Sequence, residues 1–125
     1  MKTILLVDDL GIDLMLTRMA LEGYRAAYKI TVAHDGEEAH RLLEASDFDL
    51  LLLDIKMPRV DGFELLERLR TAGNQVPTIM LSGSGLAADR ARAQALGVID
   101  YIQKAVDYSA FKDELKTTLA RHGMA

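Results

Sequence analysis

The segment LLLLD, residues 50 to 54, decides which fold we expect for this chain. Four consecutive leucines without polar alternation are typical of a strand that is buried on both faces of a parallel sheet. The run has the length of a strand rather than of a helix, and Asp54 follows where the strand would end. We therefore expect a parallel sheet that carries a carboxylate at the carboxyl end of this strand.

Four further segments resemble strands. Three are nearly continuous apolar runs, and one alternates polar and apolar residues, which is typical of an edge strand. In chain order they are Ile4 to Val7, the alternating segment Lys29 to Ala33, Thr78 to Leu81, and Val98 to Ile102. With Leu50 to Leu53 they give five predicted strands.

Helical periodicity fills the spaces between the strands. The predicted helices run from Ile12 to Gly23, after the capping residues Asp35 and Asp61, from Leu86 to Leu96, and from Tyr108 to Arg121. In the first helix the spacing of Ile12, Met15, Leu16, Met19 and Ala20 follows one helical face. We expect Met15 and Met19 to pack in the core.

The order is therefore strand then helix, five times, in one domain spanning residues 1–125. No linker, low-complexity stretch or repeat divides it. Right-handed crossovers place such a chain in an α/β fold, an open, doubly wound, five-stranded parallel sheet with helices on both faces. The order 2-1-3-4-5 is the common solution at this length, although periodicity alone does not choose it.

Composition excludes several classes of function. The net charge of −4 and the scattered basic residues argue against a nucleic-acid or membrane surface. The absence of cysteine excludes disulfides, thiolate metal sites and cysteine catalysis. The apolar run Ile4 to Val7 is too short for a signal peptide or a membrane span. We expect a cytoplasmic protein.

Polar residues follow the predicted strands. Asp8 and Asp9 come after the first, Asp54 after the third, Ser82 after the fourth, and Lys104 lies just past the fifth. Each one alone is more typical of a loop, a helix cap or a solvated surface. Because parallel strands end at the same edge of a sheet, we expect the set to converge there.

The chemistry of this set favours phosphoryl transfer. Crowded carboxylates repel one another, and either raised pKa values or a bound cation must relieve that repulsion. Oxygen ligands without His or Cys favour Mg²⁺, which takes only one or two protein carboxylates. One carboxylate then remains to act as a nucleophile and form an acyl phosphate. Lys104 and Ser82 would help to neutralise the phosphoryl group.

Five motifs in order resemble a response-regulator receiver domain, the CheY-like family with a flavodoxin-like (βα)5 fold, here of the single-domain type. The motifs are Leu6 to Asp9, Asp35 to Ala39, Leu53 to Pro58 with Asp61-Gly62, Leu81 to Gly83, and Asp100 to Lys104. Any one of them would be weak evidence. Together they span essentially the whole chain.

The resemblance implies a role for each acid. Asp54 would be phosphorylated, and Asp9 and Asp54 would bind Mg²⁺ directly together with the backbone carbonyl of Lys56. Asp8 would act on the metal largely through water. The domain would catalyse only its own phosphorylation and dephosphorylation, and so would not be an enzyme in the ordinary sense.

The resemblance also implies a switch. Ser82 would contact the phosphoryl group, Lys104 would form an ion pair with it, and Tyr101 would swing inward as Ser82 moves. Without the resemblance, Tyr101 is typical of a partly buried tyrosine on an edge strand.

Two positions correspond to places that tune phosphate lifetime in the family, and a third departs from the family pattern. Lys56 and Ser84 occupy the variable places that set phosphate lifetime, and a lysine at the first predicts slow self-hydrolysis. Ala105 replaces the usual proline after Lys104, which favours a trans bond there and puts the usual output surface in question.

Implied partners are a sensor histidine kinase or phosphotransfer protein and a downstream protein target, with the chain as monomer or homodimer. The Met1 start and short tail favour a complete protein over an excised receiver. The alternative is a Mg²⁺-dependent phosphohydrolase that forms an acyl phosphate, but such enzymes usually show Asp-x-Asp at the first strand. A nucleotide-binding domain would want a Gly-rich loop there, and Gly11 alone does not supply one.

Overall fold

The computed structural model describes residues 2–9, 11–22, 28–55, 57, 60–83, 86–104 and 107–124. Within these ranges strands and helices alternate as predicted. They are β1 Lys2–Val7, α1 Gly11–Glu22, β2 Tyr28–Ala33, α2 Gly36–Ala45, β3 Leu50–Asp54, α3 Gly62–Thr71, β4 Thr78–Ser82, α4 Ala87–Ala95, β5 Asp100–Gln103 and α5 Tyr108–Arg121. No helix in the described ranges is long and apolar enough to cross a bilayer.

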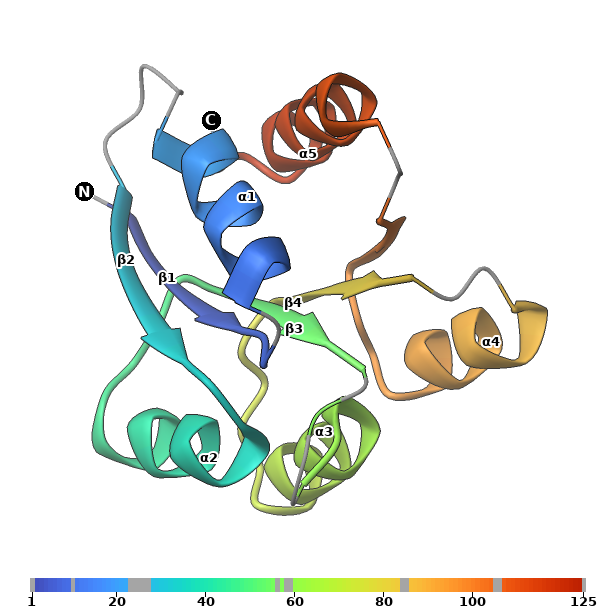
Figure 1. The fold of residues 1–125 in the computed structure, drawn as a ribbon. Helices are drawn as coiled ribbons and strands as arrows, with labels where there is room; N and C mark the ends of the chain where they lie inside the picture. The colour runs from blue at the N-terminus through green and yellow to red at the C-terminus, as the bar shows by residue number, and fades with distance from the viewer. Residues whose placement is uncertain are drawn as a thin grey trace.

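The strands form one parallel sheet in the order β2-β1-β3-β4-β5 (Figure 1), which confirms the predicted fold class and topology. The alternating segment is the edge strand β2, as its pattern indicated. Val7 lies opposite Leu53, and Asp54 lies opposite Leu81. This register brings the ends of β1, β3 and β4 to one edge of the sheet.

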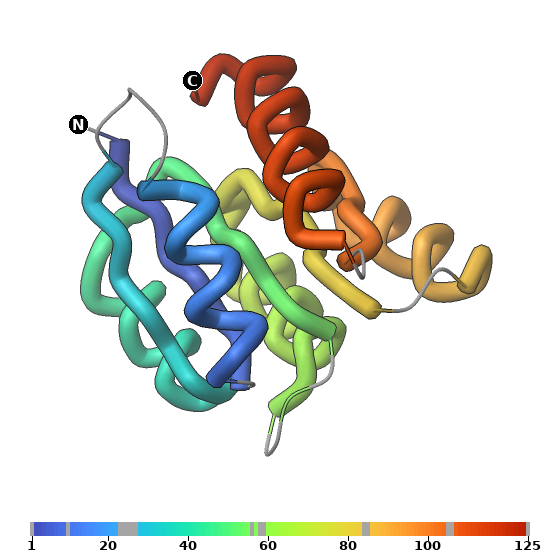
Figure 2. The backbone as a smooth tube through the Cα atoms, turned by 45° about the horizontal axis from the view of Figure 1, so that its top comes forward, coloured from blue at the N-terminus to red at the C-terminus, as the bar shows by residue number. Residues whose placement is uncertain are grey.

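Two helical layers cover the sheet and explain why the first four residues of β3 are all apolar. Helices α1 and α5 lie on one face, and α2, α3 and α4 lie on the other (Figures 1 and 2). Leu51 and Leu53 pack in the core under α2, α3 and α4, whereas Leu50 and Leu52 pack in the core under α1 and α5. All four leucines are fully buried, so neither face of the strand tolerates a polar residue at these four positions.

The rotation of α1 differs from the prediction. Met15 and Met19 are 55% and 50% exposed, whereas Ala20 and Leu21 are fully buried and Thr17 is nearly so. Helix α1 carries apolar residues on two faces, and the sheet takes the face with Thr17, Ala20 and Leu21. The expectation that Met15 and Met19 belong to the core is therefore wrong.

Strand β5 begins at Asp100 rather than at Val98. The turn that closes α4 uses Val98, whose amide donates back to the Ala93 carbonyl at 3.3 Å after Gly97 adopts a φ of 79°. An apolar residue in such a turn packs on the core without joining the strand. The apolar run alone could not show this boundary.

Two aspartates cap helices on the α2 and α3 side as predicted. Asp35 accepts a hydrogen bond from the Glu38 amide at 2.8 Å, and Asp61 accepts one from the Glu64 amide at 2.9 Å. These bonds satisfy amides that the first helical turn leaves unpaired. The Asp61 cap also fixes where the chain returns after β3, next to the nucleophile candidate.

Candidate functional site

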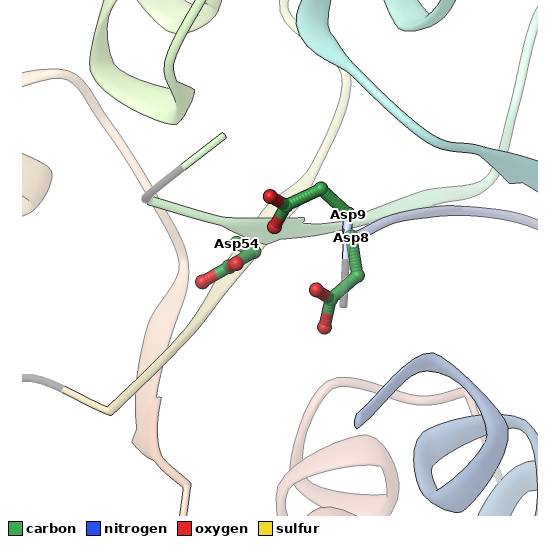
Figure 3. A group of neighbouring side chains, drawn as sticks. All are labelled: Asp8, Asp9 and Asp54. Carbon is green, nitrogen blue, oxygen red and sulfur yellow. The ribbon is translucent and has the colours of Figure 1, made fainter. Parts of the chain in front are cut away.

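Three carboxylates gather at the carboxyl ends of β1 and β3 (Figure 3). One oxygen each from Asp8, Asp9 and Asp54 lies within 4.8 Å of the others, a spacing that one cation can bridge. Asp8 and Asp54 are buried, whereas Asp9 is exposed. Their oxygen-only chemistry fits Mg²⁺, as the sequence predicted.

Lys104 reaches the same place from the end of β5. Its amide donates to the Ser82 carbonyl at 2.7 Å, which ties the segment after β5 to the end of β4. Its ammonium donates to Asp8 at 2.8 Å and lies 3.6 Å from Asp54 Oδ1. The acids at the ends of β1 and β3 and the lysine after β5 therefore form one cluster.

Burial dominates the electrostatics of Asp54. It raises the pKa of Asp54 from 3.8 to about 6; the Lys104 ammonium opposes this shift, and the Asp8 and Asp9 carboxylates add to it. Burial also tends to lower the pKa of Lys104, but its hydrogen bond to Asp8 and the charges of Asp54, Asp8 and Asp13 raise it overall. The pocket thus holds a charged lysine beside a carboxylate that is costly to ionise without a cation.

We expect Asp54→Asn to raise the free energy of unfolding of the metal-free protein near neutral pH. The folded pKa of Asp54 exceeds the unfolded one, so its stabilising effect is present below pH 3.8 and is lost as the pH rises through about 6. The free energy of unfolding of the variant should exceed that of the wild type by ~2 to 3 kcal/mol above that range and should equal it at about pH 4. Urea unfolding at several pH values with a chelator measures this, and a difference independent of pH would contradict it.

The start of α3 packs tightly against the backbone at Asp54. The Gly62 amide donates to the Ile55 carbonyl at 2.7 Å. A Cβ on Gly62 would lie 2.4 Å from the Asp54 carbonyl oxygen and 2.9 Å from the Ile55 Cα, closer than real contacts allow. Only glycine lets the start of α3 approach the backbone of the nucleophile candidate this closely.

Ser82 and Tyr101 lie on adjacent strands near the cluster. Ser82 is 2% exposed and is the last residue of β4. Tyr101 is partly buried on β5, and the Arg90 guanidinium of α4 lies 4.6 Å from its ring centre. The sequence drew attention to Tyr101 but not to Arg90, because a cation over a ring depends on the packing of α4.

An open cleft of about 590 Å³ adjoins the cluster. It is lined by Asp9 together with Met57, Phe63, Asp89 and Arg92, among others. Asp9 therefore connects the buried acids to an open space at the surface.

Other predicted positions fall outside the described residues. Lys56, with its backbone carbonyl, Ser84 and Ala105 all lie there, so their predicted roles stay predictions. Sequence reasoning also missed Asp13, whose carboxylate lies 3.3 Å from the Lys104 ammonium. The available signal was that Asp13 lies four residues after Asp9, in the first turn of a helix. An acid at such a position is equally typical of an ordinary first helical turn.

Comparison with known proteins shows the family of this chain. Residues 4–116 match the family described as the response regulator receiver domain. The chain belongs to this family. A receiver domain is the signal-accepting part of a two-component response regulator, and the predicted resemblance is confirmed.

Several relatives share the receiver domain. The transcriptional regulatory protein CpxR of Escherichia coli strain K12 is 44% identical over 105 residues, which cover 83% of this chain and 43% of CpxR. The chain thus spans less than half the length of this curated relative.

Solved structures agree over most of both chains. The phosphorylated cyanobacterial phytochrome response regulator RcpA has a TM-score of 0.86 and 30% identity, covering 94% of this chain and 91% of RcpA. The receiver domain of the sensor histidine kinase PA1611 from Pseudomonas aeruginosa PAO1, solved with a magnesium ion in its active site cleft, has a TM-score of 0.81 and 30% identity, covering 96% and 95%.

Proposed function

We propose that this receiver domain accepts a phosphoryl group on Asp54 from a histidine kinase or a phosphotransfer protein, in a transfer that depends on Mg²⁺. One observation carries the proposal: Asp54 is a buried carboxylate that shares its pocket with two further acids and with the Lys104 ammonium at 3.6 Å. RcpA, a relative with the same fold, is described as phosphorylated, and PA1611 as holding magnesium.

The acids fit the metal that this function requires. Asp9 and Asp54 would hold Mg²⁺ directly, Asp8 would act largely through water, and the backbone carbonyl of Lys56 would be a further ligand. Bound Mg²⁺ supplies positive charge that offsets both the crowded carboxylates and the incoming phosphoryl oxygens. The exposed side chain of Asp9 would give the ion access from the cleft.

The residues of this chain then perform the transfer by position and charge. A carboxylate oxygen of Asp54 forms a bond to phosphorus, while the phosphorus–nitrogen bond of a phosphohistidine donor breaks and its electron pair stays on the imidazole. Lys104 pairs with a phosphoryl oxygen, and the Ser82 hydroxyl contacts another. No general base is needed because Asp54 attacks as a carboxylate.

Phosphorylation would be communicated through Ser82 and Tyr101. As Ser82 moves toward the phosphoryl group, Tyr101 turns inward, away from the Arg90 guanidinium that lies over its ring. Such a change biases a two-state surface near α4, β5 and α5, to which a downstream protein binds. Lys56 and Ser84 would set the lifetime of the phosphorylated state.

Two other activities are less favoured. A phosphohydrolase of similar fold would not match a receiver family over residues 4–116. CpxR is named a transcriptional regulatory protein, but the part of CpxR that matches this chain is less than half its length. The acidic charge of this chain gives no reason to assign DNA binding to it.

Metal dependence tests the proposal directly. We expect acetyl phosphate to add one phosphoryl group to the wild-type protein in Mg²⁺, and the rate to fall at least ~100-fold with a chelator. Intact-mass spectrometry measures the adduct, and lability in both acid and base identifies an acyl phosphate. Equal labelling without metal would contradict the role of the acids, and repeated turnover of a generic phosphatase substrate would favour the hydrolase.

A further inference from the structure

Asp13 is a fourth carboxylate at the site and comes from the first turn of α1. Its Oδ2 lies 3.3 Å from the Lys104 ammonium. The side chain of Asp13 is 36% exposed, whereas that of Lys104 is 14% exposed. Asp13 is therefore the more exposed member of this pair, and Lys104 is partly buried.

The other two partners of Lys104 have a competing role. Asp8, at 2.8 Å, and Asp54, at 3.6 Å, both belong to the group of three acids that can share a cation. A divalent cation bound there interacts with the same two carboxylates and repels the ammonium. Burial of these groups away from water strengthens that repulsion. Among the carboxylates paired with Lys104 in the described ranges, Asp13 alone stands outside that group.

We propose that Asp13 is a positioning residue for Lys104, keeping the ammonium beside Asp54 while a divalent cation occupies the three acids. The inference rests on the proposed function, because it takes Mg²⁺ as that cation. Asp13 then strengthens Mg²⁺ binding by giving Lys104 a partner of its own. If Asp13 instead acted on the metal only through its negative charge, its effect on Mg²⁺ binding would not depend on Lys104.

A double-mutant cycle separates these two mechanisms. Calorimetry measures the Mg²⁺ dissociation constant of the wild type, Asp13→Asn, Lys104→Met and the double variant. We expect Asp13→Asn to weaken binding about five-fold when Lys104 is present and less than about two-fold when Lys104→Met is present. Equal losses in the two backgrounds, or no loss in either, would overturn the inference.

A matched variant controls for charge. Asp89→Asn removes the same charge from the cleft that Asp9 lines, but it removes no contact with Lys104. We expect it to change the Mg²⁺ dissociation constant less than about two-fold. Asp13→Glu should recover most of the affinity, because it restores a carboxylate within reach of the ammonium. A five-fold loss of Mg²⁺ affinity in Asp89→Asn would show that net charge causes the effect instead.

Proton exchange at the Lys104 ammonium tests the contact with Asp13 without metal. Nitrogen-detected NMR of the metal-free protein should show slower proton exchange at Lys104 Nζ in the wild type than in Asp13→Asn. Unchanged exchange would overturn the positioning role. If the exchange rates differ in this way but the wild type binds no Mg²⁺, the proposed function is contradicted. The contact between Asp13 and Lys104 would still be supported.

Discussion

Asp54→Asn is expected to abolish formation of the acyl phosphate. Asparagine keeps the shape of the side chain in a pocket where Asp54 is only 7% exposed, but an amide is not an anionic nucleophile. Loss of the attacking group should lower the rate of labelling by acetyl phosphate at least ~1,000-fold. The measurement is the fraction of protein that gains one phosphoryl group over time in Mg²⁺.

The matched control is Asp113→Asn, which makes the same chemical change at an exposed position on α5. It should be labelled at the wild-type rate. Urea unfolding of Asp54→Asn in the same Mg²⁺ buffer checks that its lost labelling does not come from unfolding. Wild-type labelling of Asp54→Asn would place the phosphoryl group on another residue and contradict the proposed function.

The sequence predicted the layers of the fold well because β3 is unambiguous. The leucines of residues 50 to 53 alternate between two cores, so every position had to be apolar, and the run indicated a central strand. The convergence of Asp8, Asp9 and Asp54 followed from the same parallel order. These inferences need only strand direction, which local pattern supplies.

What the sequence missed depends on the rotation and spacing of elements. Helix α1 is apolar on two faces, so periodicity found the helix but not the face that meets the sheet, and Met15 was assigned to the core wrongly. The same rotation aims Asp13 at Lys104, across 91 residues of chain. Arg90 reaches Tyr101 through the packing of α4 on β5. No local pattern encodes these contacts.

Gly62→Ala tests whether close packing behind Asp54 positions the nucleophile. The added Cβ would meet the Asp54 carbonyl oxygen at 2.4 Å and the Ile55 Cα at 2.9 Å, and both are backbone atoms that no side-chain rotation can move aside. We expect the free energy of unfolding to fall by ~3 kcal/mol, as in overpacked cores. Urea unfolding measures this loss.

The matched control is Gly11→Ala, which also adds a methyl group at the first residue of a helix. Nothing lies within 4 Å of a Cβ there, so the free energy of unfolding should stay within ~0.5 kcal/mol of the wild type. A Gly62→Ala protein as stable as this control would mean that the start of α3 moves away from Asp54 and Ile55 at little cost.

The same substitution should also slow phosphorylation of the folded protein. Relief of the clash must move either the start of α3 or the backbone of Asp54 and Ile55, which the Gly62 amide joins at 2.7 Å. A displacement of the nucleophile on the ångström scale can cost ~100-fold in rate. Labelling by acetyl phosphate, measured where Gly62→Ala is still folded, separates the two responses: a normal rate would show that α3 moves and Asp54 stays, whereas a slow rate would show that the glycine holds the carboxylate in line with the phosphoryl donor.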